Sequence, residues 1–256
     1  ESGAQRISAG DYNVILPVQT RDEIGDLTRA FNDMSRSLTV KEDLLNDQRK
    51  ENERLLHSLM PEPVADRYLQ GEEIITTEHS HVTVIFADII GLDRLQAELP
   101  SSESLALLNE LARQMDAAAA ALGMERVHTV RSGYRASCGR TVPRLDNGRR
   151  TVDFALGCGR IVDRFNSDSG TKLSPRAGID TGSVSSGLVG RPSIVYDMWG
   201  AAVNLAHQVK NGAPQPGIYV TARVHDTLQD TATFAPAGSI TVDGEDQPIW
   251  RVLEIQ

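Results

Sequence analysis

The sequence has little cysteine and no excess of basic residues. Its 256 residues include two cysteines, Cys138 and Cys158, which are too few for a disulfide framework and lack the spacing of a metal site. A reduced, intracellular compartment is therefore expected. The formal net charge of -9 argues against nucleic acid as a partner, because binding phosphates needs a basic face.

Long apolar runs are also missing. No stretch approaches the roughly 18 apolar residues of a membrane span, and no secretory leader is visible. The length and the 40% hydrophobic content suit one large or two modest domains with a real core.

The first forty residues have the pattern of two helical pieces joined by a connector. A helix tail breaks at Gly10, an alternating stretch follows, and a new helix is predicted near Asp22–Glu23, where acidic residues suit a helix N-terminus. Apolar residues then recur at spacings of 3, 4, 3 and 4, which predicts a coiled-coil seam: Ile24, Leu27, Phe31, Met34 and Leu38.

The seam continues more weakly through residues 41–78, which are predicted to form a coiled-coil or transducer helix. Lys41, Gln48 and Asn52 interrupt it with polar side chains, which lower stability but can fix register. Pro61 and Pro63 end the long helix of this region, and "PEPVADRYLQGE" adds a short helix that stops at Gly71.

The stretch "GDYNVILPVQTRDEIGDLTRAFNDM" resembles the second half of a HAMP domain. This resemblance implies a partial HAMP domain over residues 1–40, acting as a dimeric relay just inside a membrane. It also implies that the chain is the cytoplasmic portion of a longer protein of the cell membrane, attached through a missing upstream segment.

From about residue 79 the periodicity changes to that of an α/β domain. "HVTVIFADII" predicts a strand that ends near Asp88, and a strand hairpin is predicted around Ser132. "LSPRAGIDTGSVSSGLVG" predicts a further pair of strands. "IVYDMWGAAVNLAHQ" predicts a strand that delivers Asp197, then a helix with Asn204 and Gln208 one turn apart on one face. A mixed, mostly antiparallel sheet with helices mainly on one face is expected.

Four segments of residues 79–256 are similar to the class III nucleotide cyclase catalytic domain: "VTVIFADIIG", "LLNELARQMD", "RAGIDTGSVSSGLVG" and "YDMWGAAVNLA". The resemblance implies a ferredoxin-like class III cyclase fold and an obligatory dimer, in which each site takes its halves from both protomers. It also implies a reaction in which the ribose 3′-hydroxyl of ATP attacks the α-phosphorus and pyrophosphate leaves. Two Mg²⁺ or Mn²⁺ ions serve this reaction by lowering the pKa of the hydroxyl and neutralising the phosphates.

The resemblance assigns metal positions that this sequence fills unevenly. Asp88 stands at the first metal carboxylate, with the Ile89 carbonyl beside it. Ser132 occupies the position of the second carboxylate, and Arg131 precedes it. A cation pointing inward there would repel a divalent ion.

The same carry-over covers the base and phosphate positions. His128 replaces the adenine-selecting lysine, whereas its acidic partner is present as Asp197. Asn204 is present at the transition-state amide, but Gln208 replaces the arginine one turn later. Asp243 stands where the family often has a lysine that binds the triphosphate.

Each position also has a plain structural interpretation. Asp88 can cap the next helix, Asn204 can be structural, His128 can face solvent from its strand, and Asp197 can bond the backbone of its own turn. The "HSH" of residues 79–81 resembles a metal clip, but it lacks a third ligand.

Together these features predict a degenerate class III cyclase domain joined to HAMP, which acts as a homodimeric signalling module with little or no activity. Removing one transition-state donor typically lowers a rate by about 10²–10³, so several defects would remove most of the catalysis. Two alternatives stay open. One is a working adenylate cyclase with an unusual site, and the other is a regulatory partner of another cyclase.

Overall fold

The computed structural model describes residues 2–130, 133–190 and 194–255. The chain forms two compact units, Glu1–Glu73 and Ile74–Gln256. Within the described ranges, no helix combines the length and the hydropathy that crossing a bilayer demands.

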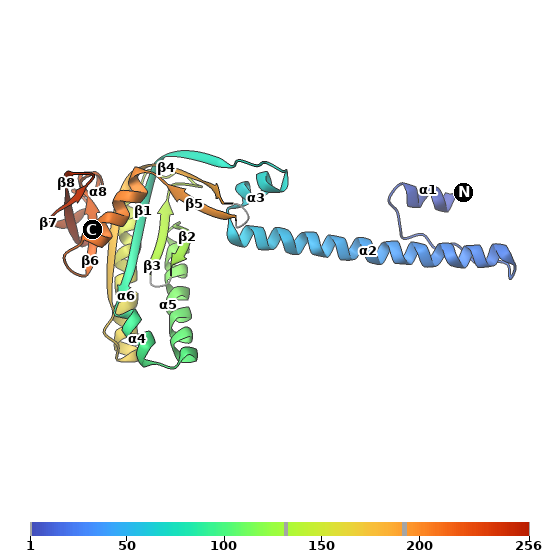
Figure 1. Ribbon diagram of the computed structural model, residues 1–256, viewed down its shortest axis with the longest axis horizontal. Coiled ribbons are helices and arrows are strands. Elements are labelled where there is room, and N and C mark those ends of the chain that lie inside the picture. The colour runs from blue at the N-terminus through green and yellow to red at the C-terminus, as the bar shows by residue number, and fades with distance from the viewer. Residues whose placement is uncertain (1, 131–132, 191–193, 256) are drawn as a thin grey trace. The chain divides into compact units, whose positions relative to one another are not determined.

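The N-terminal unit is helical, and Figure 1 shows its longest element as one continuous rod. Its helices are α1 (Ser2–Ser8), α2 (Glu23–Leu59) and α3 (Glu62–Leu69). Helix α2 begins where the sequence predicts, because the Asp22 side chain accepts a 3.2 Å hydrogen bond from the Gly25 amide. Its 37 residues include the whole expected seam.

The connector between α1 and α2 is fastened to one side of α2 by polar contacts. The Asn32 side chain makes two hydrogen bonds to the backbone of Leu16, of 2.7 and 2.8 Å. The Tyr12 carbonyl accepts from the hydroxyls of Ser35 and Thr39. The apolar seam faces elsewhere, since Leu27 is 71% exposed and Ile24 66%.

The C-terminal unit is a mixed α/β domain, as the sequence predicts. Its described strands form one eight-stranded sheet in the order β2-β3-β1-β4-β6-β8-β7, with β5 paired to β4. All pairs are antiparallel except β4 with β6. The strands are β1 (Thr76–Ile90), β2 (Glu125–Val130), β3 (Gly133–Cys138), β4 (Ser174–Val189), β5 (Val195–Trp199), β6 (Gly217–Thr221), β7 (Ala232–Val242) and β8 (Glu245–Ile255).

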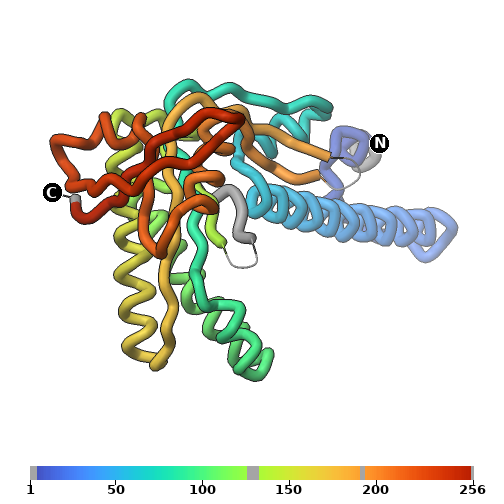
Figure 2. Tube along the Cα trace, turned by 60° about the vertical axis from the view of Figure 1, so that its left-hand side comes forward, coloured from blue at the N-terminus to red at the C-terminus, as the bar shows by residue number. Residues whose placement is uncertain are grey.

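Helices cover both faces of this sheet. The larger core lies on the face that α5 and α6 cover, and α6 runs down beside β4, the strand that follows it (Figures 1 and 2). Helix α7 packs on the opposite face against Val82 and Val84 of β1 and Val184 of β4. The helices are α4 (Leu92–Glu98), α5 (Ser101–Ala121), α6 (Asn147–Ser169), α7 (Ala201–Gly212) and α8 (Ala222–Leu228).

The prediction of two strands over residues 173–190 is wrong, because the structure has one strand there, β4. Glycines in this strand allow close backbone approach. A Cβ on Gly187 would lie 2.2 Å from the Ile75 carbonyl oxygen. Strand β4 therefore pairs with β1 along its length, with one irregularity between His79 and Val82.

Helix α7 touches the sheet backbone at Gly178 of β4. A Cβ there would lie 2.3 Å from the Ala206 carbonyl oxygen and 2.4 Å from the Lys210 amide nitrogen. No side chain fits in that gap, so glycine sets how closely the C-terminal half of α7 approaches the sheet.

We predict that Gly178→Ala lowers the free energy of unfolding by about 1–3 kcal/mol or more, because its Cβ collides with two helix backbone atoms. Urea denaturation measures the change. Gly148→Ala is the matched control, since a Cβ there meets no atom closer than 4.0 Å. An unchanged midpoint for Gly178→Ala would contradict this packing.

Candidate functional site

Asp88 is a half-buried carboxylate on the α7 face of the sheet. Alternation along β1 places it on the same face as Val84 and Phe86, near the end of the strand. Lys210 brings its Nζ to 2.6 Å from Asp88 Oδ2, and Arg176 brings its Nη2 to 3.3 Å from the same oxygen. Asp88 is thus already paired with two cations of its own protomer.

The positions of both cations follow from local structure. Arg176 lies directly opposite Asp88 in the antiparallel pairing of β1 with β4, so the two side chains share a face. Lys210 continues the buried stripe of α7, after Ala206 and Val209, and is only 9% exposed. The carboxylate of Asp88 provides the partner that a buried ammonium needs.

Asp197, on β5, is engaged in a similar way. Arg135 of β3 donates a hydrogen bond from Nη2 to Asp197 Oδ1, and the Met198 amide donates to that same oxygen at 2.8 Å. The second contact is to the backbone of the next residue, within strand β5 and not in a turn. The Arg135 guanidinium also lies 5.6 Å from the centre of the Phe86 ring, within range of a cation–π contact.

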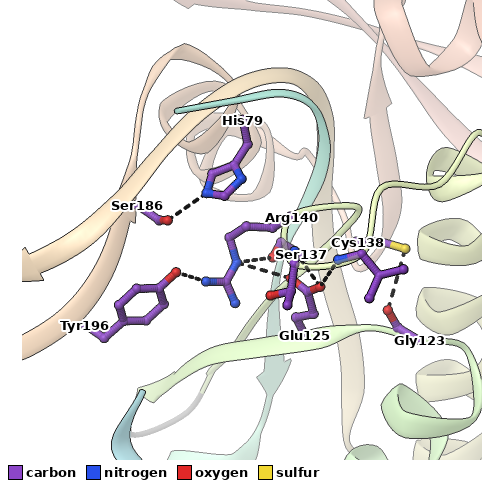
Figure 3. Close-up of polar contacts among 10 residues, drawn as sticks. His79, Gly123, Glu125, Ser137, Cys138, Arg140, Ser186 and Tyr196 are labelled. Carbon is purple, nitrogen blue, oxygen red and sulfur yellow. Dashed lines mark hydrogen bonds and ion pairs between the residues drawn. The ribbon is translucent and has the colours of Figure 1, made fainter. Parts of the chain in front are cut away.

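A buried arginine holds β5 beside the hairpin of β2 and β3. Figure 3 shows Arg140 between Glu125 of β2 and Tyr196 of β5. Arg140 makes a 3.2 Å ion pair with Glu125, donates to the Tyr196 hydroxyl and lies 4.9 Å from the centre of that ring. Since Tyr196 precedes Asp197, this network helps to place Asp197 against Arg135.

His207 of α7 lies in the same charged neighbourhood. Its ring centre is 5.1 Å from that of Phe86. Burial is the largest cause lowering the pKa of His207, and the charge of Lys210 lowers it further, while Asp88 acts in the opposite direction. These directions favour a neutral imidazole near pH 7.

Asn204 and Gln208 lie one turn apart on α7, as the sequence predicts, and away from its buried stripe. Asn204 is exposed and Gln208 half-buried. Ile89 follows Asp88 on β1 and is half-buried. His128 lies on β2 opposite Arg135 in the strand pairing.

Two other expected site residues, Asp243 and Ser132, are not part of this cluster as the structure describes it. Asp243 and Gly244 form the exposed two-residue turn of the β7–β8 hairpin, with φ values of 50° and 84°. Asp-Gly is a preferred pair for such a turn, so the backbone alone accounts for Asp243. Ser132 and Arg131 lie outside the described residues.

The residues present do not fit a centre of two divalent ions. Asp88 is the one acidic side chain at the assigned metal positions, and it holds two cations. Across the described ranges, no group of three or more histidine, cysteine, aspartate or glutamate residues has an arrangement that could hold a metal ion. His79 of the "HSH" stretch instead shares a 2.8 Å hydrogen bond with Ser186.

Sequence reasoning missed the three cations Arg135, Arg176 and Lys210. Lys210 did carry a signal, since a lysine on the apolar stripe of an amphipathic helix needs a buried partner. Arg135 and Arg176 carried none, because their partners depend on strand pairing, which the sequence does not display.

Two family matches cover most of the chain. Residues 74–254 match the family described as "Adenylate and Guanylate cyclase catalytic domain". Residues 1–39 match the HAMP domain family.

Curated relatives are adenylate and guanylate cyclases. The chain is 28% identical over 217 residues to a protein named adenylate cyclase in Mycobacterium tuberculosis, an alignment covering 84% of this chain and 48% of the relative. It is 25% identical over 226 residues to the human guanylate cyclase soluble subunit alpha-2, covering 88% of this chain and 31% of the relative. The chain thus spans about half or less of the length of these relatives.

Solved structures show the same fold. The adenylyl cyclase CyaB from P. aeruginosa superposes with a TM-score of 0.67 at 21% identity, over 71% of this chain and 97% of that one. The guanylate cyclase domain of RhGC from Catenaria anguillulae, solved in complex with GTP, gives 0.65 at 23% identity, over 70% and 100%. With a cyclase match over residues 74–254 and the shared fold, this chain belongs to the class III adenylate and guanylate cyclase family and carries a HAMP domain at its N-terminus.

Proposed function

We propose that this chain is a dimeric, HAMP-linked signalling module whose cyclase domain makes little or no cyclic nucleotide. One observation carries the proposal: both surviving site carboxylates are already ion-paired within the protomer, Asp88 with Lys210 and Arg176, and Asp197 with Arg135. A carboxylate so occupied is poorly placed to bind a metal ion or a purine amine.

Substitutions in the sequence support the same conclusion. Gln208 stands where the family has an arginine, and His128 stands where it has a lysine. Asp243 brings a negative charge to a position where a triphosphate would need a positive one. A missing cationic group in related phosphoryl chemistry lowers the rate by about 10³–10⁵. The losses affect both halves of the site, so pairing two copies of this chain does not restore it.

If ATP binds, two residues of the site would contact it. Asp197 would accept a hydrogen bond from the adenine amine, and Asn204 would donate to a phosphoryl oxygen. Mg²⁺ or Mn²⁺ supplies charge neutralisation and hydroxyl activation in this family, but Asp88, the one carboxylate at the assigned metal positions, is held by Lys210 and Arg176.

The HAMP match supports a position on the cytoplasmic side of a membrane. HAMP domains relay signals on the cytoplasmic side of bacterial membrane receptors, so this chain is proposed to be the cytoplasmic portion of a longer protein of the cell membrane. Its output would then be a change in the dimer that the cyclase domain passes to a partner.

A cyclic AMP assay with ATP and Mn²⁺ tests the proposed loss of activity. The wild-type chain should form product no faster than a protein-free blank, because Asp88, the carboxylate at the assigned metal position, is already paired with Lys210 and Arg176. Asp88→Ala identifies any real turnover, and Asp93→Ala, an exposed change on α4, is its control. Turnover that Asp88→Ala removes and Asp93→Ala retains would favour the working adenylate cyclase instead.

Repair is a sharper test of the residue assignments. Ser132→Asp, His128→Lys and Gln208→Arg should each do little alone, because the other defects remain. Combined with Lys210→Met and Arg176→Met, which remove both cations from Asp88, they should give measurable cyclic AMP. If this chain stays inert, Asp243→Lys and a replacement of Arg131 are added. A chain that carries all of these changes, folds and is still inert would contradict the assigned positions.

The dimer has its own test. The seam of α2 leaves Ile24, Leu27 and Met34 exposed in one protomer, and a parallel partner helix would cover them. Sedimentation at micromolar concentration should show a dimer. Leu27→Glu should weaken it by roughly tenfold or more, because a buried leucine contributes about 1.5–3 kcal/mol. Arg36→Glu, on an exposed position outside the seam, should not; a wild-type monomer would contradict the model of a HAMP-linked dimer.

A further inference from the structure

We propose that Lys210 and Arg176 take the place of a divalent ion at Asp88, so that this carboxylate holds fixed cations of the protein and excludes Mg²⁺ and Mn²⁺. The inference deepens the proposed function and rests on it, because it gives the physical cause of the missing metal site.

The distances place the ammonium where a metal would bind. Lys210 Nζ lies 2.6 Å from Asp88 Oδ2, and divalent ions bind carboxylate oxygens at about 2.0–2.6 Å. Arg176 Nη2 reaches the same oxygen at 3.3 Å. The other oxygen, Oδ1, faces the β3 backbone, since a Cβ on Gly133 would lie 2.8 Å from it. A divalent ion at Oδ2 would therefore have to displace an ammonium that already makes a short ion pair.

The fold holds Lys210 in this position. The Lys210 Cα would lie 3.0 Å from a Cβ on Gly178, so the helix backbone at Lys210 rests on β4. Gly178 and Arg176 lie two residues apart on β4, paired with Phe86 and Asp88. The base of the lysine and its partner are thus fixed to the same pair of strands, and the ammonium has little freedom to leave.

The balance of charge near Asp88 also opposes a metal ion. Three cations, Lys210, Arg176 and Arg135, meet two carboxylates, Asp88 and Asp197, in this cluster. Among the described residues, the Nε atoms of Arg135 and Arg176 are buried with no hydrogen-bond partner. Spare donors and surplus positive charge attract an anion and repel a divalent cation.

Titration with Mn²⁺ alone, followed by electron paramagnetic resonance of free Mn²⁺, tests the proposal on the whole chain. The wild type and Asp88→Asn should bind Mn²⁺ equally, because Asp88 of the wild type binds none. Lys210→Met removes the charge and keeps most of the apolar side chain, and with Arg176→Met it should raise Mn²⁺ affinity by roughly tenfold or more. Asp88→Asn in that background should abolish the gain.

Lys172→Met is the matched control, because it removes the charge of an exposed lysine and should leave Mn²⁺ binding unchanged. Two results would overturn the proposal. One is wild-type binding that Asp88→Asn abolishes, and the other is a folded Lys210→Met, Arg176→Met chain that gains no affinity dependent on Asp88.

A second measurement needs no variant that removes the lysine. The sequence has four lysines, so ¹⁵N-lysine labelling should resolve the ammonium signal of Lys210. Asp88→Asn should shift this signal, and saturating Mn²⁺ should leave it sharp in the wild type. Broadening by Mn²⁺ that depends on Asp88 would place the metal beside Lys210 and overturn the proposal.

These metal readouts are separate from the test of activity. A wild-type chain that binds Mn²⁺ at Asp88 and makes no cyclic AMP contradicts this inference alone. A chain that excludes Mn²⁺ from Asp88 and still makes cyclic AMP contradicts the proposed function alone.

Discussion

The contact between the backbone of α7 and Gly178 of β4 controls the chemistry of this face of the sheet. With no side chain between them, the helix approaches closely enough for Lys210 to reach Asp88 on the neighbouring strand. A helix held farther away would leave Asp88 open toward solvent. The same approach brings His207 against Phe86. One missing Cβ thus determines which groups meet across the site.

Electrostatics then decide what the site accepts. In a working two-metal site, carboxylates outnumber nearby cations, and the metal restores the balance. Here the protein supplies the cations itself, from β3, β4 and α7. Burial makes this arrangement persistent, since separating Lys210 from Asp88 would leave a charge in a poorly solvated place. The outcome is a polar cluster that is stable without a bound metal ion.

The elements and the separate site positions could be predicted from the sequence, but their pairing could not. The acidic pair Asp22–Glu23 indicated the start of α2, and the predicted strands and helix carry Asp88, Asp197 and Asn204. The pair of strands expected over residues 173–190 is one strand, β4, because its glycines allow close backbone approach, which the sequence does not display. The partners of Asp88 were hidden for a related reason, as they depend on strand register and on the depth of α7.

Strand β1 has a mechanical property that follows from its length and pairing. It begins at Thr76, just after the boundary at Glu73, and runs to Asp88 over roughly 40 Å, hydrogen-bonded to a neighbour on each side near its end. Such a strand resists stretching, so a pull at Thr76 acts as an axial load. The compliant place is the pairing irregularity between His79 and Val82. Small displacements of Thr76 would be absorbed there. Only larger displacements would strain the ion pairs that Lys210 and Arg176 make with Asp88.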